Sequence, residues 1–245
     1  MFTFNGIDFS TLVDVQEVDR PLIAPQLIST STSAGVAGTR VIRKVPQAFN
    51  IKVKFTLKES NPRTLRAYIR EIADKLDTDK PSPLIFHDED DKYINAMLSD
   101  DSSLEQLAKY GVCTINFYCN DPYWYAISDD IVEFSGDSKT FTRKGTATSY
   151  PVIEITGTNA EGTITIESDH QRMVFDGTLK AGETLVVDSE LLTAKIIGED
   201  TRSAINNLDK LDFIVLGKGT NTVKVLAEGG ATVTHTKITC NSRWK

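Results

Sequence analysis

The sequence predicts a mainly β protein with one α-helix, divided into an N-terminal and a C-terminal β domain. Three observations lead to this prediction. Most apolar segments are short and alternate apolar with polar residues, the period of a strand with one buried face. Only one segment carries apolar residues at helical spacing. A polar stretch without a long apolar run separates two groups of strands near the middle of the 245 residues.

The clearest strand covers residues 51–57 (IKVKFTL), where four hydrophobic residues share one face and Lys52, Lys54 and Thr56 share the other. Turn residues separate most of the other strands. The segment 217–221 (GKGTN), for example, is expected to connect two antiparallel strands. The other predicted strands are residues 83–86, 93–98, 112–119, 152–156, 163–167, 184–188, 213–216 and 222–226.

One amphipathic helix is predicted over about residues 62–77. Its cap is Ser60 or Asn61, and Pro62 suits the first turn. Pro81 and Pro83 prevent any continuation of the helix. The apolar positions at helical spacing are Leu65, Tyr68, Ile69, Ile72, Ala73 and Leu76.

We divide the chain near residue 130. Residues 1–130 form an N-terminal, β-sandwich-like domain with the helix, and residues 131–149 are a linker or the first strand of the second domain. Residues 150–245 form a C-terminal β-sandwich. Within the first domain, residues 29–44 are rich in glycine and small polar residues, which predicts a mobile loop or protruding arm.

Composition excludes several classes of function. The net charge of −7 lacks the basic footprint of a nucleic-acid-binding protein. We expect no signal peptide, because the first residues have neither a basic start nor an apolar run, and no stretch approaches the roughly 20 apolar residues of a membrane span. We therefore expect synthesis in a cytoplasm and no membrane insertion.

The candidate chemical sites are weak. Residues 88–91 (DEDD) offer carboxylates for a hard cation, but they lack EF-hand spacing and lie where a polar turn is expected. Cys113 and Cys119 share a strand face with Ile115 and Phe117, which indicates buried filler. We expect no catalytic residue, no metal site and no cofactor, because the histidines and cysteines are dispersed and no catalytic motif is present.

An aromatic cluster marks the end of the first domain. Pro122 ends the strand before it, and Tyr123, Trp124 and Tyr125 follow. Exposed, these rings could stack on a sugar; buried, they would form a hydrophobic clasp at the domain junction. The position of the cluster favours the clasp.

These residues, taken together, resemble the distal tail proteins of long-tailed bacteriophages, the siphophages. The similarity spans nearly the whole chain, and the motifs occur in the family's order. They are residues 2–9 (FTFNGIDF), 51–57 followed by 63–66 (RTLR), 83–86 (PLIF), 88–93 (DEDDKY), 111–117 (GVCTINF), 121–125 (DPYWY), 182–190 (GETLVVDSE), 216–221 (LGKGTN) and 243–244 (RW).

The resemblance implies a structural component of the virion tail tip, with no enzymatic activity. It implies a homo-hexameric ring built by the N-terminal domain and its arm, and a galectin-like C-terminal sandwich. Such a ring joins the tail tube protein to a tail-associated lysin or tail fibre and, in some phages, supports receptor-binding proteins. DNA would pass through it without specific binding. The candidate interface residues of the arm are Gly35, Val36, Gly38, Val41 and Ile42.

Two other functions remain open from the sequence. A carbohydrate-binding β-sandwich that attaches to cell walls would require an exposed aromatic platform, and the C-terminal half offers only Trp244. A β-sandwich glycosidase would require one specific pair of acids, which 34 acidic residues do not single out.

Overall fold

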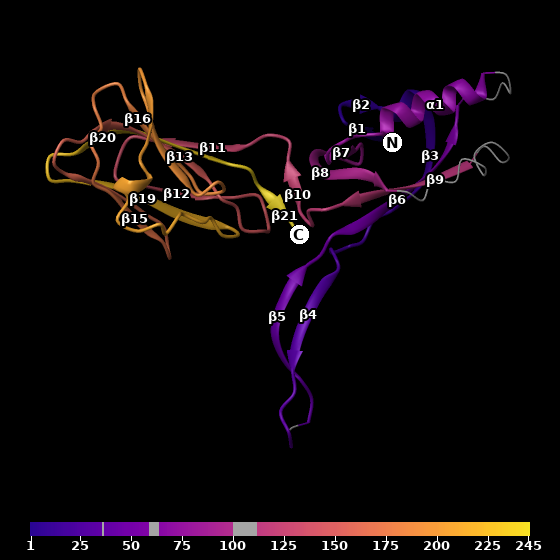
Figure 1. Ribbon diagram of the computed structural model, residues 1–245, viewed down its shortest axis with the longest axis horizontal. Coiled ribbons are helices and arrows are strands. Elements are labelled where there is room, and N and C mark those ends of the chain that lie inside the picture. The colour runs from indigo at the N-terminus through magenta and orange to yellow at the C-terminus, as the bar shows by residue number, and fades with distance from the viewer. Residues whose placement is uncertain (36, 59–63, 100–111) are drawn as a thin grey trace. The chain divides into compact units, whose positions relative to one another are not determined.

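The computed structural model describes residues 1–35, 37–58, 64–99 and 112–245. The chain divides into two compact units, an N-terminal unit of Met1–Ile127 with Lys245 and a C-terminal unit of Ser128–Trp244 (Figure 1). Each unit has a hydrophobic core of its own. The fold is mainly β with one α-helix, which confirms the predicted fold class.

The N-terminal unit is built on an antiparallel sheet in the order β2-β1-β7-β8-β9-β6-β3, with β10 paired to β8, and a separate hairpin of β4 and β5. Its elements are β1 (Phe2–Phe4), β2 (Ile7–Asp8), the 3-10 turn η1 (Phe9–Thr11), β3 (Val13–Asp19), β4 (Gln26–Ser31), β5 (Arg40–Pro46), β6 (Phe49–Leu57), α1 (Leu65–Leu76), β7 (Ser82–Phe86), β8 (Glu89–Ser99), β9 (Val112–Cys119) and β10 (Trp124–Ala126).

The core of this unit is rich in aromatic rings. Phe2 stacks on Phe9 with ring centroids 4.9 Å apart, and Phe117 packs against both Phe2 and Phe4. The alternating pattern of residues 51–57 is confirmed, since Ile51, Val53 and Phe55 are buried while Lys52 and Lys54 are exposed. The apolar face of β6 is thus buried in the core of the unit.

Helix α1 covers this core with the face that its periodicity predicts. Ile69, Ile72 and Leu76 are buried, and the Tyr68 hydroxyl donates a hydrogen bond of 2.7 Å to the Leu12 carbonyl. The helix ends at Leu76, one residue before the predicted end. The predicted cap and first turn, residues 60–63, lie outside the described residues.

The C-terminal unit is a β-sandwich, as predicted. A six-stranded sheet in the order β11-β20-β13-β16-β17-β18 and a four-stranded sheet in the order β12-β19-β14-β15 enclose one core. Its elements are β11 (Asp130–Phe134), β12 (Ser138–Thr142), β13 (Val152–Thr158), β14 (Thr163–Glu167), β15 (Arg172–Phe175), β16 (Thr184–Asp188), β17 (Thr193–Ile197), β18 (Thr201–Ser203), the 3-10 turn η2 (Ile205–Asn207), β19 (Thr220–Glu228), β20 (Thr232–Cys240) and β21 (Arg243–Trp244).

Two expectations for this unit need correction. Residues 131–149, expected to be a linker or one strand, contribute most of β11 and all of β12. Residues 213–216, predicted as a strand, are not one. Ile214 and Leu216 are fully buried, but only Leu216 forms an isolated bridge, with Ser149.

The segment 217–221 consequently does not join two strands. It leads from that irregular core segment into β19. The Asn221 side chain accepts a hydrogen bond from the Gly217 N–H and donates to the Gly219 carbonyl, so the turn is closed by a side chain rather than by a hairpin ladder.

Candidate assembly surface

The predicted arm is a β-hairpin rather than an irregular loop. Strands β4 and β5 form a two-stranded antiparallel sheet, with Gln26 opposite Pro46 and Ser31 opposite Arg40 (Figure 1). The arm therefore starts earlier than predicted and has a regular backbone. Ile28 and Thr30 in β4, and Val41, Ile42 and Val45 in β5, favour the extended conformation, a signal that the glycines between the strands obscured.

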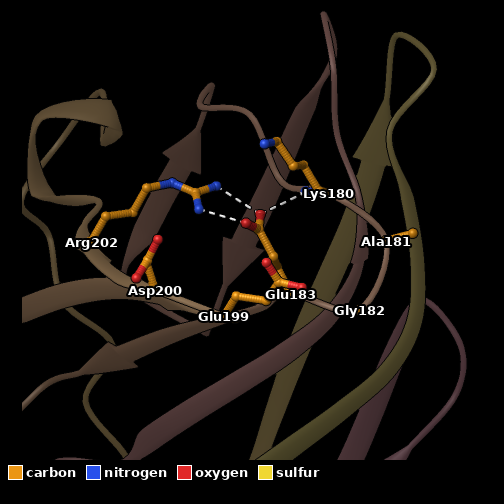
Figure 2. Close-up of a pocket in the computed structure, with 8 residues that line it drawn as sticks. Lys180, Ala181, Gly182, Glu183, Glu199, Asp200 and Arg202 are labelled. Atoms are coloured by element: carbon orange, nitrogen blue, oxygen red, sulfur yellow. Dashed lines mark hydrogen bonds and ion pairs between the residues drawn. The ribbon is translucent and has the colours of Figure 1, made fainter.

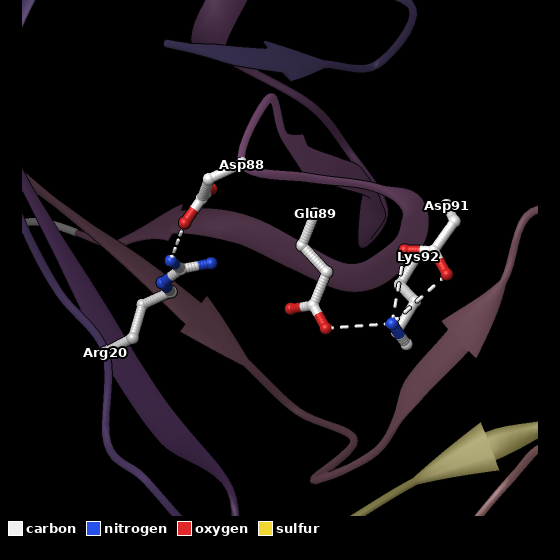
Figure 3. A network of polar contacts seen from close by, with 5 residues as sticks. All are labelled: Arg20, Asp88, Glu89, Asp91 and Lys92. Atoms are coloured by element: carbon white, nitrogen blue, oxygen red, sulfur yellow. Dashed lines mark hydrogen bonds and ion pairs between the residues drawn. The ribbon is translucent and has the colours of Figure 1, made fainter.

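The root of the hairpin is fastened to the sheet of its own unit. Arg20, just before the hairpin, lies over the Phe86 ring at 4.7 Å and forms an ion pair with Asp88 (Figure 3). At the open end of the ladder, the Gln47 N–H donates a hydrogen bond of 2.8 Å to the Pro25 carbonyl. These contacts fix where the hairpin leaves the domain.

Beyond its root, the hairpin exposes aliphatic side chains on a short isolated ladder. Val41 is 59% and Ile42 67% exposed, and Leu27 and Ile28 are each about half exposed. A two-stranded hairpin is at best marginally stable alone in water. The hairpin thus carries exposed aliphatic side chains on both of its strands.

The other predicted arm residues lie in the connection between the strands. Gly35 and Gly38 have φ angles of +77° and +92°, a conformation that favours glycine, and both are exposed. Val36 lies outside the described residues. The glycines shape the turn, and the exposed aliphatic residues of the hairpin are Val41 and Ile42 together with Leu27 and Ile28, which the sequence analysis did not single out.

The aromatic cluster packs onto the N-terminal unit itself. Trp124 lies 6.2 Å from Phe86 between ring centroids, and Tyr125 stacks on Tyr93 at 5.6 Å. The Tyr125 hydroxyl donates a hydrogen bond of 2.5 Å to the Asp121 carboxylate. Pro122 and Tyr123 are half-buried like the two rings that follow. Such half-buried rings do not present the open platform that sugar stacking requires.

Three of the four acids at residues 88–91 form ion pairs with Arg20 or Lys92. Only His87 and Asp88 form the turn, because β8 already begins at Glu89; the expectation of a longer polar turn is therefore wrong. Lys92 contacts Glu89 at 2.8 Å and Asp91 at 3.1 Å, while Asp88 pairs with Arg20 (Figure 3). In the part of the chain that the structure describes, no three His, Cys, Asp or Glu side chains converge as a metal site.

A polar depression of about 500 Å³ lies in the C-terminal unit between the loops before β16 and β18, lined by Lys180, Ala181, Gly182, Glu183, Gly198, Glu199, Asp200 and Arg202 (Figure 2). Arg202 holds the Glu183 carboxylate through two hydrogen bonds of 2.5 and 2.7 Å, and the Lys180 N–H donates a third. The Arg202 guanidinium lowers the pKa of Glu183 to about 2. The charges of Glu183 and Arg202 thus compensate each other within the depression.

The three cysteines behave as buried hydrophobic residues. Cys113 and Cys119 lie on the buried face of β9 with Ile115 and Phe117, which confirms that prediction. Burial raises the pKa of the Cys119 thiol to about 12, so the reactive thiolate is suppressed.

No helix in the described residues is both long and apolar enough to cross a membrane.

Comparison with known proteins gives two family matches. Residues 6–119 match the phage tail protein RIFT-related domain, and residues 144–244 match the C-terminal domain of the siphovirus-type tail component. The chain therefore carries both domains of a siphophage tail component, in sequence. No curated protein sequence matches it significantly.

Solved structures share the fold. The crystal structure of the phage SPP1 Dit protein, described as a paradigm of the hub adsorption apparatus in phages that infect Gram-positive bacteria, matches with a TM-score of 0.80 and 17% identity, over 100% of this chain and 98% of that chain. The phage p2 baseplate in its activated conformation, with strontium or calcium, matches with a TM-score of 0.49 and 10% identity over 94% of this chain and 90% of that chain, too weakly to carry an argument.

Proposed function

The chain belongs to the family of siphophage distal tail proteins, and from this premise we propose that six copies assemble into a ring at the tip of the virion tail. The ring joins the tail tube protein to a tail-associated lysin or tail fibre and provides attachment for receptor-binding proteins where the phage has them. Its role is structural rather than catalytic. DNA passes through the ring without sequence-specific binding.

The observation that supports assembly into a ring is the β4–β5 hairpin with its exposed aliphatic residues. The hairpin is anchored at its root by Arg20 and carries Val41 and Ile42 on a ladder that has no other strand beside it in the described residues. A neighbouring copy is the partner that every subunit of a ring possesses. Under cyclic symmetry one such contact is repeated at each interface, so it closes the assembly cooperatively.

The test measures the mass of the purified full chain. We expect a species of six times the 27.1 kDa of one chain by light scattering, and a ring with six-fold symmetry by negative-stain microscopy. Val41→Ser with Ile42→Ser should weaken assembly, because burying two such side chains contributes about 2 kcal/mol per interface, roughly a thirtyfold change in affinity.

The matched control changes equally exposed aliphatic residues in the other unit, Leu191→Ser with Leu211→Ser, which are 69% and 64% exposed. This control should assemble like the wild type. A wild-type chain that stays monomeric at micromolar concentration would contradict the ring, and an equal effect of both variants would contradict the role of the hairpin.

A further inference from the structure

Two strands of the N-terminal unit have open backbone edges of equal length. Strand β3 ends the main sheet and pairs only with β6, and β5 pairs only with β4, among the described residues. Each has seven residues. An open edge presents unpaired N–H and C=O groups and is a template on which a further strand can pair.

The two edges carry opposite charge. Strand β3 bears three exposed acids and no base, and β5 bears three exposed bases and no acid. No acidic residue occurs anywhere from Arg20 to Lys58, although the whole chain has a net charge of −7. The acids are Asp14, Glu17 and Asp19, and the bases are Arg40, Arg43 and Lys44.

The acids of β3 already have cations on their inner side. Asp14 lies 3.5 Å from the Lys58 ammonium group, and in the strand register Glu17 is opposite Lys54 and Asp19 opposite Lys52. Their outer side faces the open edge. A basic strand arriving there would bring cations close to these acids on the side away from β6, whereas an acidic strand would bring like charges close together.

The charge pattern also determines which strand edges of two copies can pair. Two β3 edges would place acids against acids, and two β5 edges would place bases against bases; both arrangements are unfavourable. Pairing β3 with β5 satisfies both strands, and it joins different patches of two identical subunits. Such a head-to-tail contact generates a ring when the rotation between copies closes.

We propose that β5 of one copy adds to the open edge of β3 of the next copy, so that the main sheet continues from subunit to subunit. This inference rests on the proposed ring and names the surface that receives the hairpin. The charges then serve two purposes: they exclude pairing between identical edges, and they fix the direction of assembly around the ring.

The experiment reverses the charges of each strand in the full chain and follows assembly by sedimentation. One variant carries Arg40→Glu, Arg43→Glu and Lys44→Glu, a second carries Asp14→Lys, Glu17→Lys and Asp19→Lys, and a third carries all six changes. We expect each single set to weaken assembly at least tenfold and the combined variant to recover to within about threefold of the wild type. Raising the salt concentration should weaken the wild-type ring as well.

Two further variants keep the result interpretable. Lys139→Glu, Lys195→Glu and Lys210→Glu reverse three exposed bases of the C-terminal unit and should leave assembly unchanged. Since lysines on β3 would face Lys52 and Lys54, the milder set Asp14→Asn, Glu17→Gln and Asp19→Asn tests the same edge if the reversed set does not fold, as judged by circular dichroism. It should also weaken assembly.

The possible outcomes separate this inference from the proposed function. If each variant reversed in one strand still forms the ring normally, the β3–β5 contact is wrong and the proposed ring still stands. The same conclusion follows if the variant with all six changes does not recover assembly. A monomeric wild type overturns both. If the β5 set leaves assembly unchanged but abolishes binding of duplex DNA, β5 is a nucleic-acid surface and the inference fails.

Discussion

At the scale of single residues, the most consequential side chain is a buried arginine that the sequence gives no reason to single out. Arg143 is 4% exposed, and its guanidinium donates hydrogen bonds of 2.9 Å to the carbonyls of both Leu216 and Gly217. It also donates to the Ala147 carbonyl and the Ser149 hydroxyl. The arginine thereby ties the segment after β12 to the irregular core segment before β19.

Replacing this arginine should destabilise the C-terminal unit. Arg143→Met removes the hydrogen bonds to the Ala147, Leu216 and Gly217 carbonyls and to the Ser149 hydroxyl, which costs about 3 kcal/mol in the free energy of unfolding. Calorimetry of the full chain should show a lower transition temperature for the C-terminal unit and no change for the N-terminal unit. Arg172→Met, at an exposed position, is the control and should shift neither transition. Equal effects of the two variants would show that Arg143 does not hold the core segment.

The ion pair of Glu183 and Arg202 predicts a pH dependence. The pKa of Glu183 is lowered from 4.5 to about 2 in the folded chain, so the carboxylate stabilises the fold above pH 4.5 and loses this effect as the pH falls toward 2. Glu183→Gln should therefore lower the melting temperature at neutral pH, and the difference from the wild type should shrink between pH 4.5 and pH 2. Glu199→Gln, on the same rim, is the control. A difference that stays constant across this range would rule out the ion pair as its cause.

At the scale of elements, the sequence predicts strands well where apolar residues supply the buried face. Residues 112–119, 163–167 and 184–188 coincide with β9, β14 and β16. Strand β20 was missed because its buried face is partly polar: Thr236 is fully buried in line with Ile238 and Cys240. Hydrophobic alternation cannot identify a strand whose inward positions include threonine.

The opposite error arose at residues 213–216. The run of Phe213, Ile214 and Leu216 indicates burial, and these side chains are indeed in the core. A strand also needs a free neighbouring edge for its backbone, and the sequence does not show which edges are occupied. The segment finds only one isolated bridge here, Leu216 with Ser149. An apolar run thus predicted the core but not the hydrogen bonding.

The arm shows a similar limit. Glycines and small polar residues indicated an irregular segment over residues 29–44, but residues 29–31 belong to β4 and residues 40–44 to β5, so the irregular part is confined to the connection between the two strands. Whether two flanking strands pair depends on their register, which a weakly amphipathic pattern specifies poorly. The candidate contact residues Val41 and Ile42 were accessible to sequence reasoning because aliphatic residues are unusual in a protruding segment. Leu27 and Ile28 were not, because they precede the segment taken as the arm.

At the scale of the whole molecule, the order of motifs along the chain indicated the family. The two family matches, over residues 6–119 and 144–244, cover the two regions in which most of these motifs lie. The surfaces that would act in assembly required the structure. The complementary edges of β3 and β5 depend on which strand ends a sheet, and only the sheet order shows that. The division near residue 130 followed from composition, which allowed for a linker or one strand just beyond it, whereas the structure has two strands there, β11 and β12.

The division into two units predicts where self-association resides. The hairpin and both open, charged edges lie in Met1–Ile127, so we expect a fragment of residues 1–127 to assemble and a fragment of residues 128–245 to remain monomeric. The second fragment must start at residue 128, because starting at 151 would remove β11 and β12, which pair with β20 and β19. Light scattering of each fragment over a concentration series measures the result, and circular dichroism establishes that each is folded. If the C-terminal fragment assembles and the N-terminal fragment stays monomeric, the ring contacts do not lie in the N-terminal unit. The interface would then have to be sought among the exposed aliphatic residues of the sandwich, such as Leu191 and Leu211.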